Sequence, residues 1–150
     1  MIRPSSPPPA PPSSMHSEIR QCFRQYDVRG IISKHGLSND VHVWPESSSL
    51  STTLAFAIGC AYAAELAEEI PEPDEGWWVA IGYDARFSGP HLVQALEAGL
   101  RCGGINVYRL GLVPTPVVYF ATHHLNHQTQ HCHGGIVVTG SHNPSDWNGF

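Results

Sequence analysis

A serine beside a histidine, in a loop that directly follows an apolar run, is the part of this sequence best suited to chemistry. Residues 135–139 read Gly-Ile-Val-Val-Thr, and residues 140–144 read Gly-Ser-His-Asn-Pro. Ligands of open α/β sheets bind outside the carboxyl ends of the strands, so this loop would border a site. A rigidly held Ser141 hydroxyl could act as a nucleophile or a phosphoryl carrier, provided that a base or a cation lies nearby. The same string could equally be an ordinary loop without chemistry.

The segments that would position this loop alternate between predicted strands and predicted helices. Apolar periodicity, caps and prolines predict helices over residues 50–70, 88–103 and 115–124, with Ser88 as the N-cap of the second. Short apolar runs predict buried strands over residues 78–82, 105–110 and 135–139, and residues 23–33 read as an extended segment. Strands that alternate with helices in this way imply an α/β layer architecture.

The charge of the chain is negative and local. Thirteen Asp and Glu stand against eight Lys and Arg, for a formal net charge of −5, which argues against a protein that binds nucleic acid by neutralising its phosphates. Six of the acids lie within residues 65–75, so a site for a small anion elsewhere in the chain stays possible. Seven of the eight basic residues are Arg, whose guanidinium suits bidentate contacts with phosphate or carboxylate.

The first residues differ in composition from the rest. Residues 1–17 contain six of the 13 prolines together with several serines, and this composition predicts a disordered or polyproline II tail. Two overlapping PxxP patterns would suit an SH3-type partner, and Met15 offers an alternative start that would leave the tail untranslated. The domain organisation is therefore a tail over residues 1–17 and one α/β domain over residues 18–150.

Cysteine spacing and hydropathy indicate the cellular compartment of the protein. The four cysteines are scattered without a C-x-x-C pair, which favours reduced thiols in a cytoplasmic protein over a disulfide framework. The longest apolar run, residues 54–64, is shorter than the roughly 18 residues that a membrane span requires. We therefore expect no membrane span, and the tail lacks the apolar core of a secretory signal.

A histidine-rich segment offers a second candidate site. His123, His127 and His131 are spaced by four, and on a continuing helix they would share a face that could bind zinc or nickel. The segment also contains Asn, Gln and Thr, which favours a surface loop after the third helix. An alternative function for the whole chain is therefore a non-catalytic α/β module that binds an anion or a metal.

Four blocks of sequence carry a family resemblance, in the same order as in that family: residues 23–30, 81–89, 113–116 and 139–150. Together they make the chain similar, over residues 22–150, to the N-terminal domain of the α-D-phosphohexomutase family, in its phosphomannomutase/phosphoglucomutase branch. The resemblance implies a mixed, mostly parallel sheet flanked by helices, which is domain I of that family. It also implies that the later domains lie beyond residue 150 and that this fragment is inactive alone.

The resemblance implies an isomerase that works through a phosphoserine. Ser141 would pass a phosphoryl group to a hexose phosphate, form a bisphosphorylated sugar, and take a phosphoryl group back from the other position. The net reaction would interconvert the 1-phosphate and 6-phosphate of mannose or glucose. Mg²⁺ would be held by Ser141 through its phosphoryl group, with its remaining ligands beyond residue 150. The partners implied are hexose phosphate, hexose bisphosphate and the remaining mutase domains, with no nucleic acid and no membrane.

The same resemblance assigns roles to particular residues. Ser141, His142 and Arg29 would be catalytic, and Tyr26, Arg29 and Asn143 would bind substrate. Asp84 and Arg86 read as structural support behind the site, tied by charge-assisted bonds. Two of these assignments have plain alternatives. Arg29 could simply brace its own turn with Asp27, and Tyr26 could be a core aromatic residue.

Overall fold

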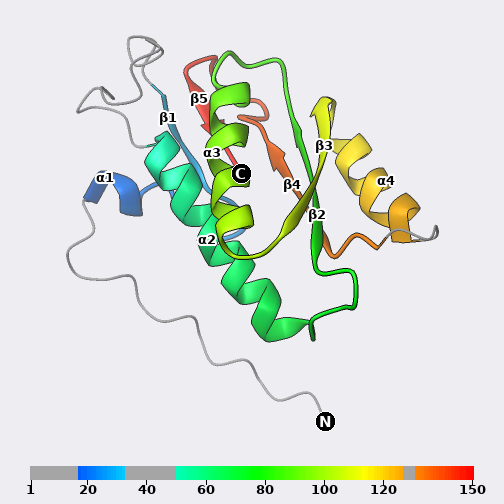
Figure 1. Cartoon of the computed structure of the whole chain (residues 1–150). Coiled ribbons are helices and arrows are strands. Elements are labelled where there is room, and N and C mark those ends of the chain that lie inside the picture. The colour runs from blue at the N-terminus through cyan, green and yellow to red at the C-terminus, as the bar shows by residue number, and fades with distance from the viewer. Residues whose placement is uncertain (1–16, 33–49, 127–130) are drawn as a thin grey trace.

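The structure, a computed structural model, describes residues 17–32, 50–126 and 131–150 (Figure 1). The expected tail lies outside these residues except for Ser17, which begins a short helix. The elements in chain order are α1 (Ser17–Arg20), β1 (Arg29–Ile31), α2 (Thr52–Glu69), β2 (Trp78–Tyr83), α3 (Gly89–Cys102), β3 (Asn106–Leu112), α4 (Thr115–Asn126), β4 (Gly134–Val138) and β5 (Trp147–Gly149).

The predicted α/β architecture with a mostly parallel sheet is confirmed. Strands β3, β2 and β4 form a parallel sheet in that order, and β1 and β5 form an antiparallel pair. The two parts are linked where β4 ends, because the Thr139 amide donates to the Gly149 carbonyl at 3.0 Å. The β1–β5 pair therefore lies beside the carboxyl end of β4, next to the loop that carries Ser141.

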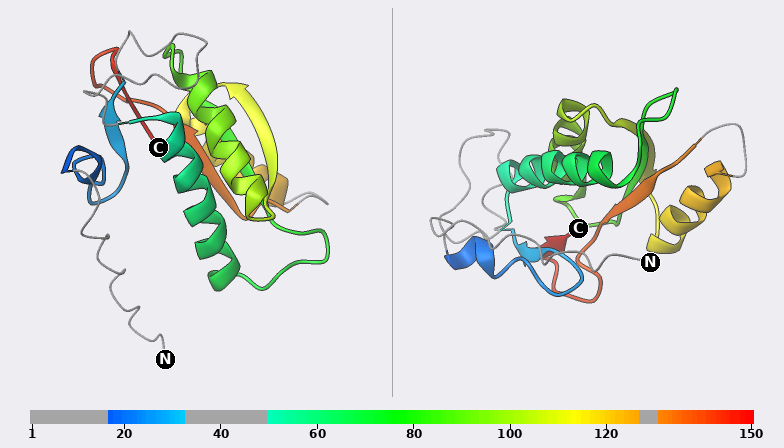
Figure 2. Two further views of the ribbon diagram at one scale, coloured as in Figure 1. Left: turned by 60° about the vertical axis from the view of Figure 1, so that its left-hand side comes forward. Right: turned by 90° about the horizontal axis from the view of Figure 1, so that it is seen from below.

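Helices cover both faces of the parallel sheet (Figures 1 and 2). Helix α3 packs against one face, with α2 lying beside it, and α4 packs against β2 and β4 on the other. The contact between α2 and α3 depends on glycine, because a Cβ built at Gly99 would lie 2.1 Å from the Phe56 carbonyl oxygen. This close approach helps to bury the core completely around Leu50, Ile81, Leu92 and Leu96.

The helix ends follow the sequence signals with one exception. Helix α2 begins after Ser51, whose hydroxyl accepts from the Leu54 amide at 3.1 Å. Ser88 is the N-cap residue of α3 by position, as predicted, and its carbonyl accepts from the Leu92 amide at 3.1 Å. Its side chain, however, makes no cap hydrogen bond. Its buried hydroxyl instead accepts a hydrogen bond from Asn148 Nδ2 at 2.8 Å, and this bond ties β5 to the start of α3.

A buried carboxylate joins α3 to the edge strand β3. Glu97 is 2% exposed, and it accepts hydrogen bonds from Arg109 Nε at 2.6 Å and Arg101 Nε at 2.8 Å. Burial alone would raise the pKa of Glu97, but the hydrogen bonds and charges of Arg109 and Arg101 outweigh it and lower that pKa. The carboxylate is therefore stable as an ion inside the fold.

A search for membrane spans found no helix of sufficient length and apolar character among the residues that the structure describes.

The Glu97 ion pair predicts a pH-dependent contribution to stability. Because its pKa is lower in the folded chain than in the unfolded chain, the contribution is present above about pH 4.3 and is lost as the pH falls through the folded pKa. Glu97→Gln should lower the free energy of unfolding by about 1–3 kcal/mol near pH 7. Urea unfolding from pH 7 to pH 3 should show this difference shrinking at acid pH.

The matched control is Glu68→Gln on the exposed surface of α2, which should change stability by no more than about 0.5 kcal/mol. A Glu97→Gln difference that stays constant down to pH 3 would contradict the assignment of an ionised Glu97.

Candidate active site

Ser141 lies in the loop between β4 and β5, at the carboxyl end of the parallel sheet. This is where the strand prediction put it, and the residue is exposed. Its backbone has φ of 52°, and among the described residues it is the only non-glycine residue with a positive φ. An L-residue pays a steric penalty in this left-handed region, so neighbouring contacts must hold it there. Nothing in our reading of the sequence predicted this conformation.

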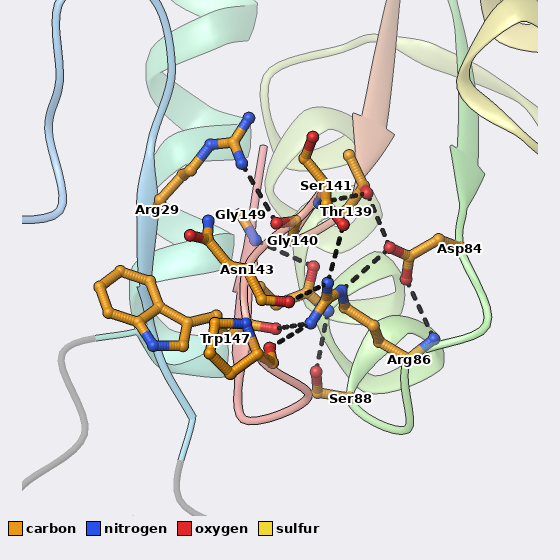
Figure 3. A network of polar contacts seen from close by, with 12 residues as sticks. Arg29, Asp84, Arg86, Ser88, Thr139, Gly140, Ser141, Asn143, Trp147 and Gly149 are labelled. Atoms are coloured by element: carbon orange, nitrogen blue, oxygen red, sulfur yellow. Dashed lines mark hydrogen bonds and ion pairs between the residues drawn. The ribbon is translucent and has the colours of Figure 1, made fainter.

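Arg86 connects the loop to the end of β2 (Figure 3). Its side chain donates through Nε to Asp84 Oδ2 at 3.1 Å. Its two Nη groups donate to four backbone carbonyl oxygens, those of Ser141, Asn143, Pro144 and Trp147. All five N–H bonds of the guanidinium are thereby used, and a planar fork with five donors is what this arrangement requires.

The backbone comes close to Arg86 at Gly140. A Cβ built on Gly140 would lie 2.4 Å from Arg86 Cζ, so a side chain there would displace the guanidinium or the loop. Gly140 therefore lets the chain pass directly over the group that holds it.

Asp84 and Thr139 extend this network to the Ser141 amide. The Asp84 carboxylate accepts from the Arg86 amide at 3.0 Å and from the Thr139 hydroxyl at 2.7 Å. The Thr139 oxygen in turn accepts from the Ser141 amide at 2.9 Å. The contacts of Thr139 were not predicted. The available signal was a hydroxyl residue at a strand end, two positions before Ser141, where side chain to backbone bonds are common.

Arg29 contacts the same loop from the opposite side. It begins β1, pairs with Gly149 of β5, and donates through Nη1 to the Gly140 carbonyl at 3.2 Å. Its Nε also contacts the Asp27 carboxylate, so the bracing of its own turn and the contact with the loop coexist. Glycine is needed at position 149, because a Cβ there would lie 2.2 Å from the Val28 carbonyl.

The remaining predicted site residues, Tyr26, His142 and Asn143, are held by fewer contacts. Tyr26 is 89% exposed, so the alternative that it is a core aromatic residue was wrong. His142 is exposed as well, and neither side chain is hydrogen-bonded within the described part of the chain. Asn143 is half-buried and is held through its backbone, since its amide donates to the Gly140 carbonyl at 2.9 Å and its carbonyl accepts from Arg86.

A cavity of about 960 Å³ lies on the Arg86 side of the loop. Its wall includes residues 84–88, Asn143, Ser145 and Asp146. Ser141 is exposed and is not part of that wall.

The histidine-rich segment does not form a metal site in the part of the chain that the structure describes. Helix α4 ends at Asn126, and His127 lies outside the described residues. The described residues contain no group of three or more His, Cys, Asp or Glu side chains that could hold a metal ion. His133 Nδ1 accepts from the Trp78 amide at 3.1 Å, and the buried Cys132 thiol contacts the Gly134 carbonyl. The four cysteines, all within the described residues, form no disulfide.

Comparison with known proteins identifies the family. The family described as phosphoglucomutase/phosphomannomutase, alpha/beta/alpha domain I, matches residues 20–150. The chain belongs to this family and is its domain I. The match begins near α1 and includes every element that touches the Ser141 loop.

Relatives of this domain I are named as mutases. A phosphoglucomutase of Neisseria gonorrhoeae is 38% identical over 137 residues, and a phosphomannomutase/phosphoglucomutase of Pseudomonas aeruginosa PAO1 is 39% identical over 129 residues. These matches cover 91% and 85% of this chain but only 24% and 22% of the relatives. A crystal structure of a phosphoglucomutase/phosphomannomutase family protein from Burkholderia thailandensis matches with a TM-score of 0.67 at 38% identity. It aligns with 91% of this chain and 26% of its own. The chain thus spans about a quarter of the proteins it resembles.

The Arg86 network predicts a large effect of a charge-conserving substitution. Arg86→Lys keeps the positive charge but has a single nitrogen, which cannot reach four carbonyls and a carboxylate together. We expect the free energy of unfolding to fall by about 2–4 kcal/mol, because partly buried carbonyls lose their donors.

Arg109→Lys is the matched control, because Arg109 makes a single ion pair and its side chain is 69% exposed. It should lower stability by about 1 kcal/mol or less. Urea unfolding measures the loss of free energy of unfolding in both variants. Equal losses in Arg86→Lys and Arg109→Lys would show that Arg86 does not hold the loop together.

Proposed function

We propose that this chain is the phosphoserine-carrying domain of a hexose-phosphate mutase, which interconverts the 1-phosphate and 6-phosphate of mannose or glucose. Ser141 would carry the phosphoryl group. The single observation that best supports this role is that an exposed serine is held in a left-handed backbone conformation by Arg86 and Thr139. The family membership of the chain gives that serine its chemistry.

The reaction would consist of two phosphoryl transfers of opposite direction. In the first, a sugar hydroxyl oxygen bonds to the phosphorus of phosphorylated Ser141 and its proton passes to a base, while the bond from phosphorus to Ser141 Oγ breaks and Oγ takes up a proton. The product is a hexose bisphosphate. In the second, Ser141 Oγ gives up its proton and bonds to the phosphorus of the other phosphoryl group, while the bond from that phosphorus to the sugar oxygen breaks and the sugar oxygen takes up a proton. In such transfers the protein contributes mainly by positioning the reacting groups and by stabilising the charge of the transferred phosphoryl group.

Among the described residues, Arg29 is the cation that we expect to stabilise the phosphoryl group. Figure 3 shows its guanidinium and the Ser141 hydroxyl on the side of the loop away from Arg86. Nε and Nη1 are engaged with Asp27 and Gly140, whereas Nη2 has no hydrogen-bond partner among the described residues. A guanidinium anchored at one edge can offer its other edge to phosphate oxygens without losing its position.

His142, Asn143 and Tyr26 would complete this part of the site. His142 directly follows Ser141 and is exposed, so its imidazole can exchange a proton or donate to a sugar hydroxyl. The side-chain amide of Asn143 and the hydroxyl of the exposed Tyr26 would bind the hexose phosphate.

A magnesium site would need ligands beyond those that these residues provide. The described residues hold no cluster of three or more His, Cys, Asp or Glu side chains suited to a metal ion, so they do not form a magnesium site by themselves. The contribution of this chain would be the phosphoryl group on Ser141. We therefore assign no step of the reaction to the ion on the basis of these residues.

The rest of the mutase would come from outside this domain. The relatives are about four times longer than the matched region, so the sugar-reading residues and the second phosphate grip are expected in the other domains. We also propose a cytoplasmic enzyme, which is consistent with four cysteines that form no disulfide.

The test is Ser141→Ala in the full-length protein. Without the hydroxyl no phosphoryl group can be carried, and mutase turnover should fall by about 10³-fold or more. Interconversion of glucose or mannose 1-phosphate and 6-phosphate is the measurement, and mass spectrometry of the wild type should find phosphate on Ser141.

Ser145→Ala is the matched control, an exposed serine of the same loop, and it should stay within about threefold of the wild type. Retained turnover in Ser141→Ala would rule out the phosphoserine mechanism. Absence of turnover in the wild-type full-length protein, with sugar phosphate still bound, would favour the non-catalytic binding module.

A further inference from the structure

The left-handed conformation of Ser141 needs a local cause. A non-glycine residue in this region is sterically disfavoured and persists only where surrounding contacts hold it. Two side chains bond directly to the backbone of Ser141. Arg86 donates to its carbonyl at 3.0 Å, and Thr139 accepts from its amide at 2.9 Å.

The direction of the hydrogen bonds through Thr139 is determined by Asp84. An ionised carboxylate only accepts hydrogen bonds, so the single hydroxyl proton of Thr139 is committed to Asp84 Oδ2, 2.7 Å away. A lone pair of the Thr139 oxygen is then left for the Ser141 amide. The branched side chain of threonine further restricts its rotamer, so this acceptor stays in one place.

We propose that Thr139 is the positioning residue for Ser141. Its hydroxyl holds the Ser141 backbone in the left-handed conformation that directs Oγ away from the Arg86 network and toward the substrate. The role is distinct from that of Arg86, which ties down four carbonyls and so holds the whole loop. Thr139 acts on one amide group. Its loss should therefore misplace the transferred group while leaving the loop attached to the sheet.

This inference rests on the proposed function, because it concerns the position of the serine that would carry the phosphoryl group. It predicts an effect on turnover and not on substrate affinity. Small misplacements of a reacting group can lower the rate about 10²-fold. The Thr139 hydroxyl is bonded to Asp84 and to the Ser141 amide, so we expect it to make no contact with the sugar.

The experiment compares two substitutions of Thr139 in the full-length protein. Thr139→Val keeps the branched shape and removes the hydroxyl, and we expect kcat to fall about 10- to 100-fold with KM within about threefold of the wild type. Thr139→Ser restores the hydroxyl and should stay within about threefold in kcat. The ³¹P resonance of phosphorylated Ser141 should move in Thr139→Val and keep the wild-type position in Thr139→Ser.

Thr122→Val is the matched control, because it removes a threonine hydroxyl from α4 that bonds only to the Tyr119 carbonyl. It should leave kcat, KM and the ³¹P resonance unchanged. Thermal unfolding would monitor folding, and Thr139→Ala, with the same expected losses, would replace Thr139→Val if that variant does not fold.

Two results would overturn the proposal for Thr139. One is a kcat within threefold of the wild type in the variant without the hydroxyl. The other is an equal loss in Thr139→Ser, because then the hydroxyl is not what matters. Full turnover in Ser141→Ala would instead reject the proposed function itself, so the two failures are distinguishable.

Discussion

The guanidinium of Arg86 is the group on which the geometry of the Ser141 loop depends. It stands at the end of β2, is oriented by Asp84, and holds four carbonyls between Ser141 and Trp147. Buried or partly buried carbonyls of a loop need hydrogen-bond donors, which can come from backbone amides, side chains or water. Arg86 supplies a donor to four of them, and the loop thereby takes its position from the end of the central strand β2.

Other features of the fold allow the contacts between Arg86 and the Ser141 loop. Gly140 leaves room for Arg86, and Gly149 lets β5 approach Val28 and bring Arg29 to the opposite side of the loop. The buried bond between Asn148 and Ser88 ties β5 to α3 just after Arg86. The loop is consequently held between two guanidinium groups and anchored at both ends, while the side chains of Ser141 and His142 stay exposed.

Much of this arrangement could be predicted from the sequence, and the remainder has a physical explanation. Short-range patterns located the helices and parallel strands, because periodicity and proline act over a few residues. The same signals placed Ser141 at a strand end. They placed Ser88 at the start of α3 but missed the partner of its hydroxyl, since Asn148 lies 60 residues away. They also missed the left-handed backbone of Ser141 and the contacts of Thr139, which arise only when the ends of β2 and β4 are brought together.

The combination of a strained backbone and an exposed hydroxyl is what reciprocal phosphoryl transfer would require of this domain. A serine that gives a phosphoryl group to one end of a sugar and takes it from the other must be reachable from two substrate orientations, so it cannot be enclosed by its own domain. Exposure alone would leave the group mobile and lose the benefit of orientation. The contacts of Arg86 and Thr139 resolve this conflict by acting only on the backbone around Ser141. The backbone of Ser141 is thereby held in one conformation while its side chain stays exposed, as the proposed transfer would require.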